Sequence, residues 1–399
     1  MSSAKLAHSA DWHVREDLFD QLGPALVRMA QVCDAERVDL HIVAGDLFER
    51  KSTPEERMFL VRHLQLLADV SPLVIVRGNH DAHLDLDIFR EVRSAHPIRF
   101  VDRPDVIEHG GISVACLPWP SRAFLAREKE IHSVDDINRE GGRAVLELLR
   151  WLAARPVGGI FRVLAAHLNV AGARTSTGQT MVGREIEIGP HDLNELEFDY
   201  CALGHIHRHQ DFDSPVVYAG SPVPQNFGET DPAGFVIAEL DEAGVAWRHI
   251  DLGASRRHTL EIEVDIEGNM IGEDLPILNG EFVGRDGSAP IADGDFVKLR
   301  VTHPAGFKVD HDRFALYLLN INPRVRVTVE PVARPTSRVR CEEAAAAETL
   351  REKVEATLLS QGRIEEFDER GRAMLDALEK GEDFPLPEEP AREAMSCNS

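Results

Sequence analysis

The chain has few cysteines and no long hydrophobic run, and each absence excludes a class of protein. Its five cysteines are scattered through 399 residues without a C-x-x-C pair, which excludes a disulfide scaffold and a zinc knuckle. No apolar run approaches the ~20 residues of a membrane-spanning helix. The first residues, Met1 to Trp12, also lack the apolar segment of a signal peptide. We therefore expect a cytoplasmic protein without membrane contact.

Basic residues are outnumbered by acidic ones, 44 to 68, so the net charge is −24. Proteins that coat nucleic acid through bulk charge are usually basic, and this balance argues against non-specific coating. An enzyme that holds divalent cations is still allowed, because bound cations reverse the local field at the site. The one clearly basic stretch has five arginines between Arg324 and Arg340. It either contacts phosphates or protects an exposed strand edge.

The first 250 residues alternate strand-like and helix-like segments, which is typical of a layered α/β domain. The β-rich runs Val38–Ala44 and Leu73–Val76 predict buried strands. Between them, Thr53 as N-cap and Pro54 at the first helical position predict a helix over Pro54–Asp69.

The pattern changes after Asp251 to strands at His258–Ile266 and Phe296–Thr302, which indicates a small α+β domain. Asn269–Gly294 is rich in Gly, Asp and Pro and predicts a long loop. Two amphipathic helices follow, the second with its apolar stripe starting at Ile364. The expected parts are residues 1–252 (α/β domain), 253–340 (small domain), 341–380 (helical pair) and 381–399 (acidic disordered tail).

Five polar clusters each follow a predicted strand. Ligands collect outside the carboxyl ends of strands in open α/β sheets, so the clusters can converge on one rim. A single strand-end histidine is more often structural, but five clusters in series favour a site. The clusters are Asp11-Trp12-His13, Gly45-Asp46, Gly78-Asn79-His80-Asp81, Ala166-His167 and Gly204-His205-Ile206-His207.

The residue types in these clusters indicate a metal site. Carboxylates, an amide oxygen and imidazoles suit Mn, Fe or Zn better than Mg or Ca, which prefer oxygen ligands alone. There are more ligands than one catalytic ion takes from protein, but their number suits two ions that share a carboxylate. The candidate metal ligands are Asp11, His13, Asp46, Asn79, His167, His205 and His207.

The cluster order resembles that of the calcineurin-like metallophosphoesterases, and the longer context is similar to the SbcD branch, nuclease subunits of double-strand-break repair. The resemblance is close over residues 5–250 and looser over the small domain. Its motifs are His8–His13 (HSADWH), Ala44–Phe48 (AGDLF), Gly78–Asp81 (GNHD), Gly204–His207 (GHIH) and Tyr218–Pro222 (YAGSP). It implies a layered β-sandwich flanked by helices, a small α+β capping domain and a C-terminal helical pair.

The resemblance also implies a role for each cluster residue and two divalent ions, with Mn²⁺ favoured. His80 would be catalytic and Asp81 would position it. Glu49 departs from the family, which often has Asp or His there. One ion would be held by Asp11, His13, Asp46 and His207, and the other by Asp46, Asn79, His167 and His205.

The implied function is a metal-dependent DNA exonuclease or endonuclease in DNA end processing. It would act as a nucleoid-associated homodimer with an SMC-like, SbcC-like ATPase. The chain has no G-x-x-x-x-G-K-[ST] loop for binding ATP, so ATP use would have to come from that other chain. The alternative is a stand-alone metallophosphodiesterase on nucleotides or other small phosphodiesters, which shares every ligand. A scaffold with a degenerate site is disfavoured, since the ligands are intact. The side chains expected to face the ATPase are Leu350, Val354, Phe367 and Leu378.

Overall fold

A computed structural model gives the fold of two compact units. The larger unit comprises Met1–His303 and Phe307–Val332, and the smaller comprises Pro304–Gly306 and Ala333–Ser399. The structure describes residues 3–82, 85–120, 134–175, 186–229, 231–271, 277–278, 281–282, 291–334, 344, 346–360, 363–364 and 367–380.

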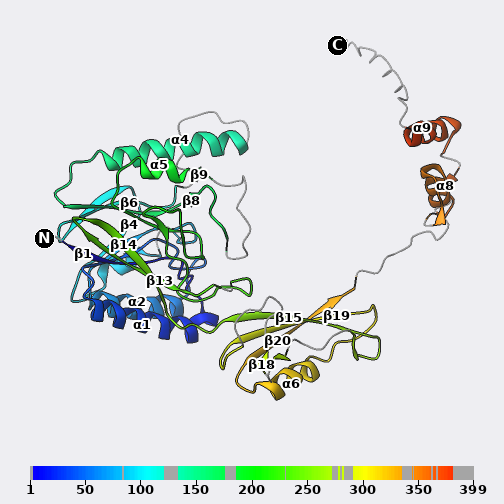
Figure 1. Ribbon diagram of the computed structural model, residues 1–399, viewed down its shortest axis with the longest axis horizontal. Coiled ribbons are helices and arrows are strands. Elements are labelled where there is room, and N and C mark those ends of the chain that lie inside the picture. Colours follow the sequence, from blue (N-terminus) through cyan, green and yellow to red (C-terminus); the bar gives the residue numbers. More distant parts are fainter. Residues whose placement is uncertain are drawn as a thin grey trace, which may run out of the picture. The chain divides into compact units, whose positions relative to one another are not determined.

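Two six-stranded sheets form the centre of the larger unit (Figure 1). Each sheet has four neighbouring parallel strands, and its remaining strands pair antiparallel. The first sheet has the order β14 (Gly244–Asp251), β13 (Gly234–Asp241), β1 (Ala4–Ser9), β2 (Leu40–Val43), β3 (Leu73–Val76) and β4 (Ile98–Val101). The second has the order β11 (Gln210–Asp211), β12 (Val216–Tyr218), β10 (Tyr200–Gly204), β7 (Phe161–His167), β6 (Ile112–Leu117) and β5 (Asp105–His109).

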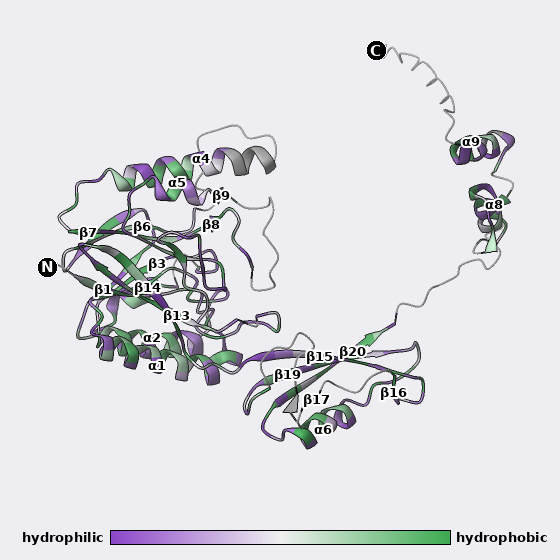
Figure 2. Ribbon diagram, viewed as in Figure 1, coloured by the Kyte–Doolittle hydropathy of each residue, from purple (hydrophilic) through white to green (hydrophobic). Residues whose placement is uncertain are grey.

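Three hydrophobic layers hold these sheets together. The inner layer joins the facing surfaces of both sheets, including Leu6 and Ile42 from the first and Val163 and Ala202 from the second. The outer layers lie under α1 (Phe19–Glu36) and α2 (Pro54–Ala68) on one side and against α4 (Val134–Ala153) and α5 (Pro190–Asn194) on the other. Figure 2 shows hydrophobic stretches along both strands and covering helices. The predicted layered β-sandwich flanked by helices is confirmed.

The predicted helix after Thr53 is confirmed together with its start signal. The Thr53 hydroxyl accepts a hydrogen bond from the Glu56 backbone N–H, and the Glu56 carboxylate accepts one from the Thr53 N–H. This capping box satisfies two backbone donors that the first helical turn leaves without partners. The predicted strand Leu73–Val76 is found with the same bounds, and all four of its residues are buried.

The larger unit also contains a small α+β structure with its own core, built on a four-stranded sheet that we call the smaller sheet. Its strands run in the order β16 (Met270–Ile271), β15 (Arg257–Val264), β19 (Phe296–His303) and β20 (Arg326–Ala333), and α6 (His311–Ile321) packs on it. The predicted long loop over Asn269–Gly294 is wrong in part. It includes β16, which pairs with β15, and a short hairpin of β17 (Ile277–Leu278) and β18 (Glu281–Phe282). Two-residue strands are too short for a periodic signal.

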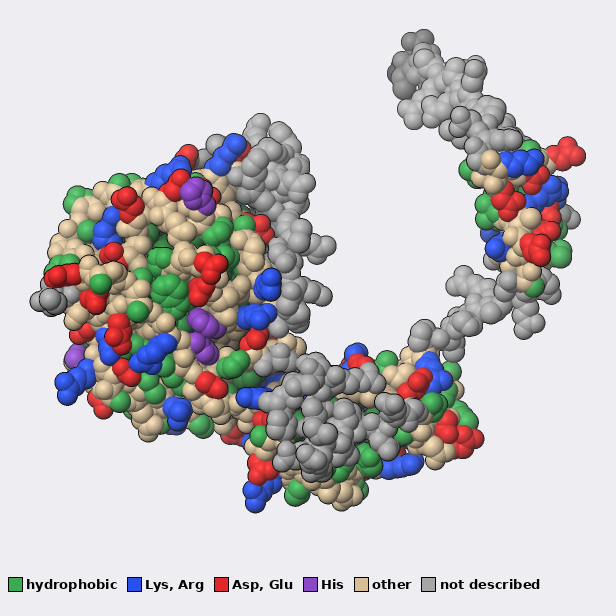
Figure 3. Space-filling model, in the orientation of Figure 1, with side chains coloured by type: hydrophobic (Ala, Val, Ile, Leu, Met, Phe, Trp, Pro, Cys, Tyr) green, Lys and Arg blue, Asp and Glu red, His purple; other side chains and the backbone are tan. Residues whose placement is uncertain are grey.

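The arginine-rich stretch falls partly on β20, an edge strand of the smaller sheet. The Arg324 guanidinium pairs with Asp293 at 2.6 Å, and that of Arg326 lies 4.9 Å from the ring centre of Phe296. Arg338 and Arg340 lie outside the described residues. Figure 3 shows acidic and basic side chains interspersed over the visible face of the larger unit. Phosphate contact by this stretch remains a prediction.

The smaller unit contains α8 (Leu350–Ser360) and α9 (Glu369–Lys380), which contact each other through ion pairs such as Arg351–Asp376 at 3.0 Å. The predicted helical stripe from Ile364 is wrong at its start, because α9 begins at Glu369. The Asp368 carboxylate accepts a hydrogen bond from the Gly371 N–H at 2.7 Å and so marks the helix start. The predicted disordered tail lies outside the described residues.

The apolar stripes of these two helices are only partly covered. Leu350 is 40% exposed and Leu378 is 54% exposed, while Val354 and Phe367 are half-buried. None of the helices in the described part of the chain is long and apolar enough to cross a membrane.

Asp295 joins the loop before β19 to the start of β15 in the small α+β structure. Its carboxylate is buried and accepts hydrogen bonds from the backbone N–H groups of Arg256 and Ala292 and from Nε2 of His258, at 2.8–2.9 Å. Burial alone would raise the pKa of Asp295, but these donors outweigh burial and hold that pKa below its usual value of 3.8. The ionised Asp295 carboxylate therefore stabilises the folded state at pH values above 3.8. This stabilisation is lost as the pH falls through the lowered pKa of the folded protein.

We expect Asp295→Ala to lower the free energy of opening of β15 and β19 by about 1.5–3 kcal/mol, the range for hydrogen bonds to a charged group. Hydrogen exchange of the amides of these two strands measures this change. The matched control is Asp293→Ala, which removes an exposed pair with Arg324 and should cost about 1 kcal/mol or less. Equal effects of the two substitutions would contradict this account of Asp295.

Candidate dimetal centre

The polar clusters predicted from the sequence lie just beyond the carboxyl ends of neighbouring strands. Asp11 and His13 follow β1, Asp46 follows β2, and Asn79 follows β3, all in the first sheet. In the second sheet His167 ends β7, and His205 and His207 follow its neighbour β10. Because the two sheets face each other, the clusters share one rim.

Four of these seven residues have left-handed backbone conformations, although none of them is glycine. The φ angles are 55° at Asp11, 45° at His13, 54° at Asp46 and 105° at His205. Such conformations are uncommon outside glycine, cost of order 1–3 kcal/mol each and concentrate at functional sites. The strained backbone turns each side chain from the strand direction toward the rim.

Two glycines leave room for the ligand side chains. A Cβ atom at Gly45, where φ is +92°, would lie 2.3 Å from Nδ1 of His167. At Gly78 it would lie 2.1 Å from Oδ1 of Asp46. Both distances are far shorter than any van der Waals contact. The side chains of His167 and Asp46 thus occupy the space that a side chain at either glycine would need.

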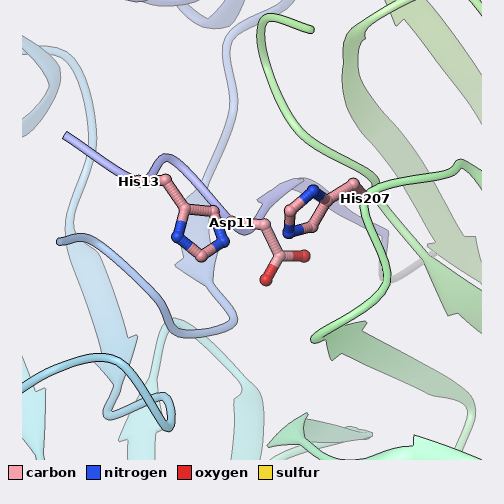
Figure 4. A group of neighbouring side chains, drawn as sticks. All are labelled: Asp11, His13 and His207. Atoms are coloured by element: carbon pink, nitrogen blue, oxygen red, sulfur yellow. The ribbon is translucent and has the colours of Figure 1, made fainter. Parts of the chain in front are cut away.

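One group of donors consists of Asp11, His13 and His207, whose ligand atoms lie within 4.8 Å of one another (Figure 4). Asp11 and His13 are buried, and the Asp11 carboxylate accepts a hydrogen bond from the His205 backbone N–H at 2.9 Å. Nε2 of His13 is buried and has no hydrogen-bond partner among the described residues. A buried polar atom without a partner is costly, and a bound cation removes that cost.

Asp46 lies between this group and the second one. Its Oδ2 is 3.3 Å from Nε2 of His167 and 3.8 Å from Nε2 of His13. Its Oδ1 accepts a hydrogen bond from the backbone N–H of His80 at 2.9 Å. One oxygen is therefore fixed by the backbone while the other faces donors of both groups, as a bridging carboxylate requires.

The second group gathers around the side chain of Asn79. Its Oδ1 is 2.8 Å from Nε2 of His167 and 3.2 Å from Nδ1 of His205. Nδ1 of His167 faces the carbonyl oxygen of Ala44 at 2.7 Å, so this nitrogen carries the proton and donates. In the neutral ring, Nε2 then keeps its lone pair toward the centre.

The charges of the centre are strongly coupled. Burial alone would lower the pKa of His167, but the carboxylates of Asp46 and Asp11 outweigh it and raise this pKa to about 9. Burial acts in the opposite sense on Asp46, where His167 and His13 hold the carboxyl pKa well below its usual range. The carboxylates of Asp46 and Asp11 thus favour positive charge in this pocket. Cation binding therefore competes with a proton on His167.

His80 and Asp81 differ in their surroundings. The His80 side chain is exposed, and its Nδ1 donates to the carbonyl oxygen of Glu49 at 2.7 Å. Asp81 is buried and accepts hydrogen bonds from the backbone N–H groups of Phe48 and Gly78. Burial and the nearby Asp46 raise its pKa to about 6. Asp81 thus joins the two rim loops that flank His80, and its role in positioning His80 stays a prediction.

Two carboxylates of the centre are not among the predicted site residues. Oε1 of Glu229 is 2.9 Å from Nδ1 of His207, and Oε2 of Glu49 is 2.9 Å from Nδ1 of His13. In the sequence, Glu49 differs from the family pattern, but nothing there indicates a contact with His13. Glu229 lies in a loop 22 residues after its histidine and belongs to no motif, so only the folded chain reveals it.

These donors fit two divalent cations. Oxygen and nitrogen ligand atoms converge from both sheets, one carboxylate lies between two groups of ligands, and a buried ring nitrogen lacks a partner. The fold and the site thus define a metal-dependent hydrolase with a dimetal centre.

The calcineurin-like phosphoesterase family matches residues 4–209. The SbcD component of the SbcCD nuclease of Staphylococcus epidermidis is 23% identical over 259 residues, which are 59% of this chain and 66% of that protein. Among solved structures, a dimetal phosphatase from Danio rerio is 12% identical at a TM-score of 0.38, covering 61% of this chain and 96% of its own. Purple acid phosphatase PPD1 from yellow lupin is 12% identical at 0.36, covering 62% and 52%. The chain belongs to the calcineurin-like phosphoesterase family.

Proposed function

We propose that this protein is a DNA nuclease, a metal-dependent exonuclease or endonuclease in DNA end processing and double-strand-break repair. The observation that carries metal-dependent hydrolysis is the convergence of the seven ligand side chains on one rim. The likeness to a component of a nuclease supports DNA as the substrate, although the aligned part spans just under two thirds of that relative.

The side chains beside the centre suit a polymeric substrate. Asn79 and His80 are both exposed, so a phosphodiester within a long chain can approach them without entering an enclosed cavity. Trp119 lies at the same rim, with its ring centre 4.9 Å from that of His205. Aromatic side chains next to a phosphate site are suitable surfaces for stacking a nucleobase.

The metal ligands would be the seven predicted residues, with Mn²⁺ as the favoured ion. When bound, the two cations would lower the pKa of a water molecule and neutralise charge on the phosphate. Asp46, fixed through the His80 N–H, would hold its free oxygen between both ions. The buried Asp11 and His13 exclude bulk solvent from the inner side of the centre.

His80 is proposed as the general acid for the leaving oxygen. With Nδ1 donating to the Glu49 carbonyl, its Nε2 is the nitrogen available to a substrate at the exposed rim. The ring centre of His80 is 5.0 Å from that of His13, which places the proposed acid next to a metal ligand. A protonated Nε2 there can transfer its proton to the leaving oxygen.

An SMC-like ATPase is the proposed partner, with the protein acting as a homodimer in that complex. The partly exposed stripes of α8 and α9 support this proposal, because two short helices leave apolar surface that a partner helix pair can cover. The proposed contact residues remain Leu350, Val354, Phe367 and Leu378.

The full chain should degrade linear single-stranded and double-stranded DNA in the presence of Mn²⁺ and lose that activity with a chelator. End-labelled and internally labelled DNA distinguish exonuclease from endonuclease products on gels. A small diester, bis(p-nitrophenyl) phosphate, serves as the comparison substrate. Hydrolysis of the small diester without any cleavage of DNA would favour the small-molecule phosphodiesterase instead.

A further inference from the structure

We propose that Glu229 is a positioning residue that fixes the imidazole of His207 with Nε2 directed at the cation beside Asp11 and His13. The inference rests on the proposed metal centre. It adds Glu229 as a residue that orients one of the metal ligands. His207 points toward Asp11 and His13 in Figure 4, and Glu229 contacts its opposite ring nitrogen at 2.9 Å.

The carboxylate of Glu229 is held independently of the histidine. Glu229 is only 6% exposed. Its Oε2 accepts a hydrogen bond from the backbone N–H of Gln225 at 2.6 Å, and its Oε1 accepts one from Nδ2 of Asn226 at 2.8 Å. An acceptor that is buried and fixed by two other donors sets the orientation of the ring that donates to it.

The loop that carries Glu229 is itself anchored. Arg257 is buried, and its Nε donates to the carbonyl oxygen of Pro224 at 3.1 Å. Its guanidinium also lies 5.4 Å from the ring centre of Phe227. These two contacts hold the segment just before Glu229 in place and so limit how far Glu229 can move.

The chemistry of the contact determines the tautomer of His207. An ionised carboxylate only accepts hydrogen bonds, so Nδ1 of the neutral ring must carry the proton. Nε2 then retains its lone pair on the side of Asp11 and His13. Donation to a carboxylate also raises the basicity of an imidazole ligand, and loss of such a partner typically costs 10–100-fold in metal affinity.

The two groups of metal ligands differ in the acceptors that hold their histidine rings. Nδ1 of His167 faces the neutral carbonyl of Ala44, whereas Nδ1 of His207 faces the carboxylate of Glu229. A charged acceptor polarises the ring more than a neutral one. We therefore expect the ion beside Asp11, His13 and His207 to be the more tightly bound of the two.

Calorimetric titration of the metal-free full chain with Mn²⁺ tests the role of Glu229. Glu229→Ala should raise the Kd of one equivalent by about 10–100-fold and leave the other unchanged. The retained equivalent shows that the variant is folded. The matched control is Glu195→Ala, because Glu195 also faces a histidine, His191, at 3.3 Å, but both side chains are exposed, and its loss should change neither Kd.

Two-bond ¹H–¹⁵N NMR of the metal-free protein, at a pH where the ring is neutral, gives a second readout. His207 should carry its proton on Nδ1 in the wild type and lose that preference in Glu229→Ala. Unchanged Mn²⁺ affinities, or equal weakening of both equivalents, would overturn the positioning role. A wild type that binds no Mn²⁺ would instead refute the metal centre, and the NMR measurement would still decide the role of Glu229.

Discussion

Asp46→Ala is expected to abolish binding of both metal ions and to reduce phosphodiester hydrolysis by about 10⁴-fold or more, the scale on which loss of a catalytic unit acts. The reason is the position of its Oδ2, which faces Nε2 of both His13 and His167. Removing a ligand of a single ion would weaken the binding of that ion alone, whereas removing the bridging carboxylate weakens the binding of both ions. Metal analysis after dialysis and calorimetry with Mn²⁺ measure the expected loss.

The matched control for this substitution is Asp20→Ala, which removes an exposed carboxylate from the first turn of α1. It should retain two equivalents of metal and full activity. If Asp46→Ala kept two equivalents with ordinary affinity, the bridging role of Asp46 would be wrong.

His80→Ala is expected to keep both metal ions and its affinity for DNA while cleavage falls by about 10²–10⁴-fold, the usual contribution of a general acid or base. The side chain is exposed, and the hydrogen bond from the His80 backbone N–H to Asp46 survives the substitution, so the bridging carboxylate should keep its position. Single-turnover cleavage with saturating Mn²⁺ separates this chemical defect from binding.

His96→Ala provides the comparison, because His96 is an exposed histidine between β3 and β4 and should be neutral in the same assay. Cleavage by His80→Ala at the wild-type rate in the metal-loaded protein would remove His80 from the proposed mechanism.

Much of the fold was predictable because its signals are local. Buried strands such as Leu73–Val76 are continuous apolar runs, and Thr53 with Pro54 marks a helix start through backbone chemistry that a few residues determine. The short strand Met270–Ile271 was not predictable, because it depends on pairing with β15. The start of α9 was misplaced because an apolar stripe can continue past a helix end, while the Asp368 cap fixes that end.

The candidate ligands were predictable for a related reason. Each follows a recognisable strand, and parallel topology brings strand ends to a common rim. Their supporting groups were not predictable, because Glu229 reaches His207 through the tertiary path of a loop. The contact of His80 with the Glu49 carbonyl was not predictable either, because every residue has a backbone carbonyl and the sequence does not indicate which one is contacted.

The central claim is that two cations share this rim with Asp46 between them. Anomalous diffraction at the manganese edge from crystals grown with Mn²⁺ tests it most directly. The account predicts two peaks in contact with Asp46, one also ligated by Asp11, His13 and His207 and the other by Asn79, His167 and His205. A single peak, or peaks that leave Asp46 without a metal contact, would contradict the account.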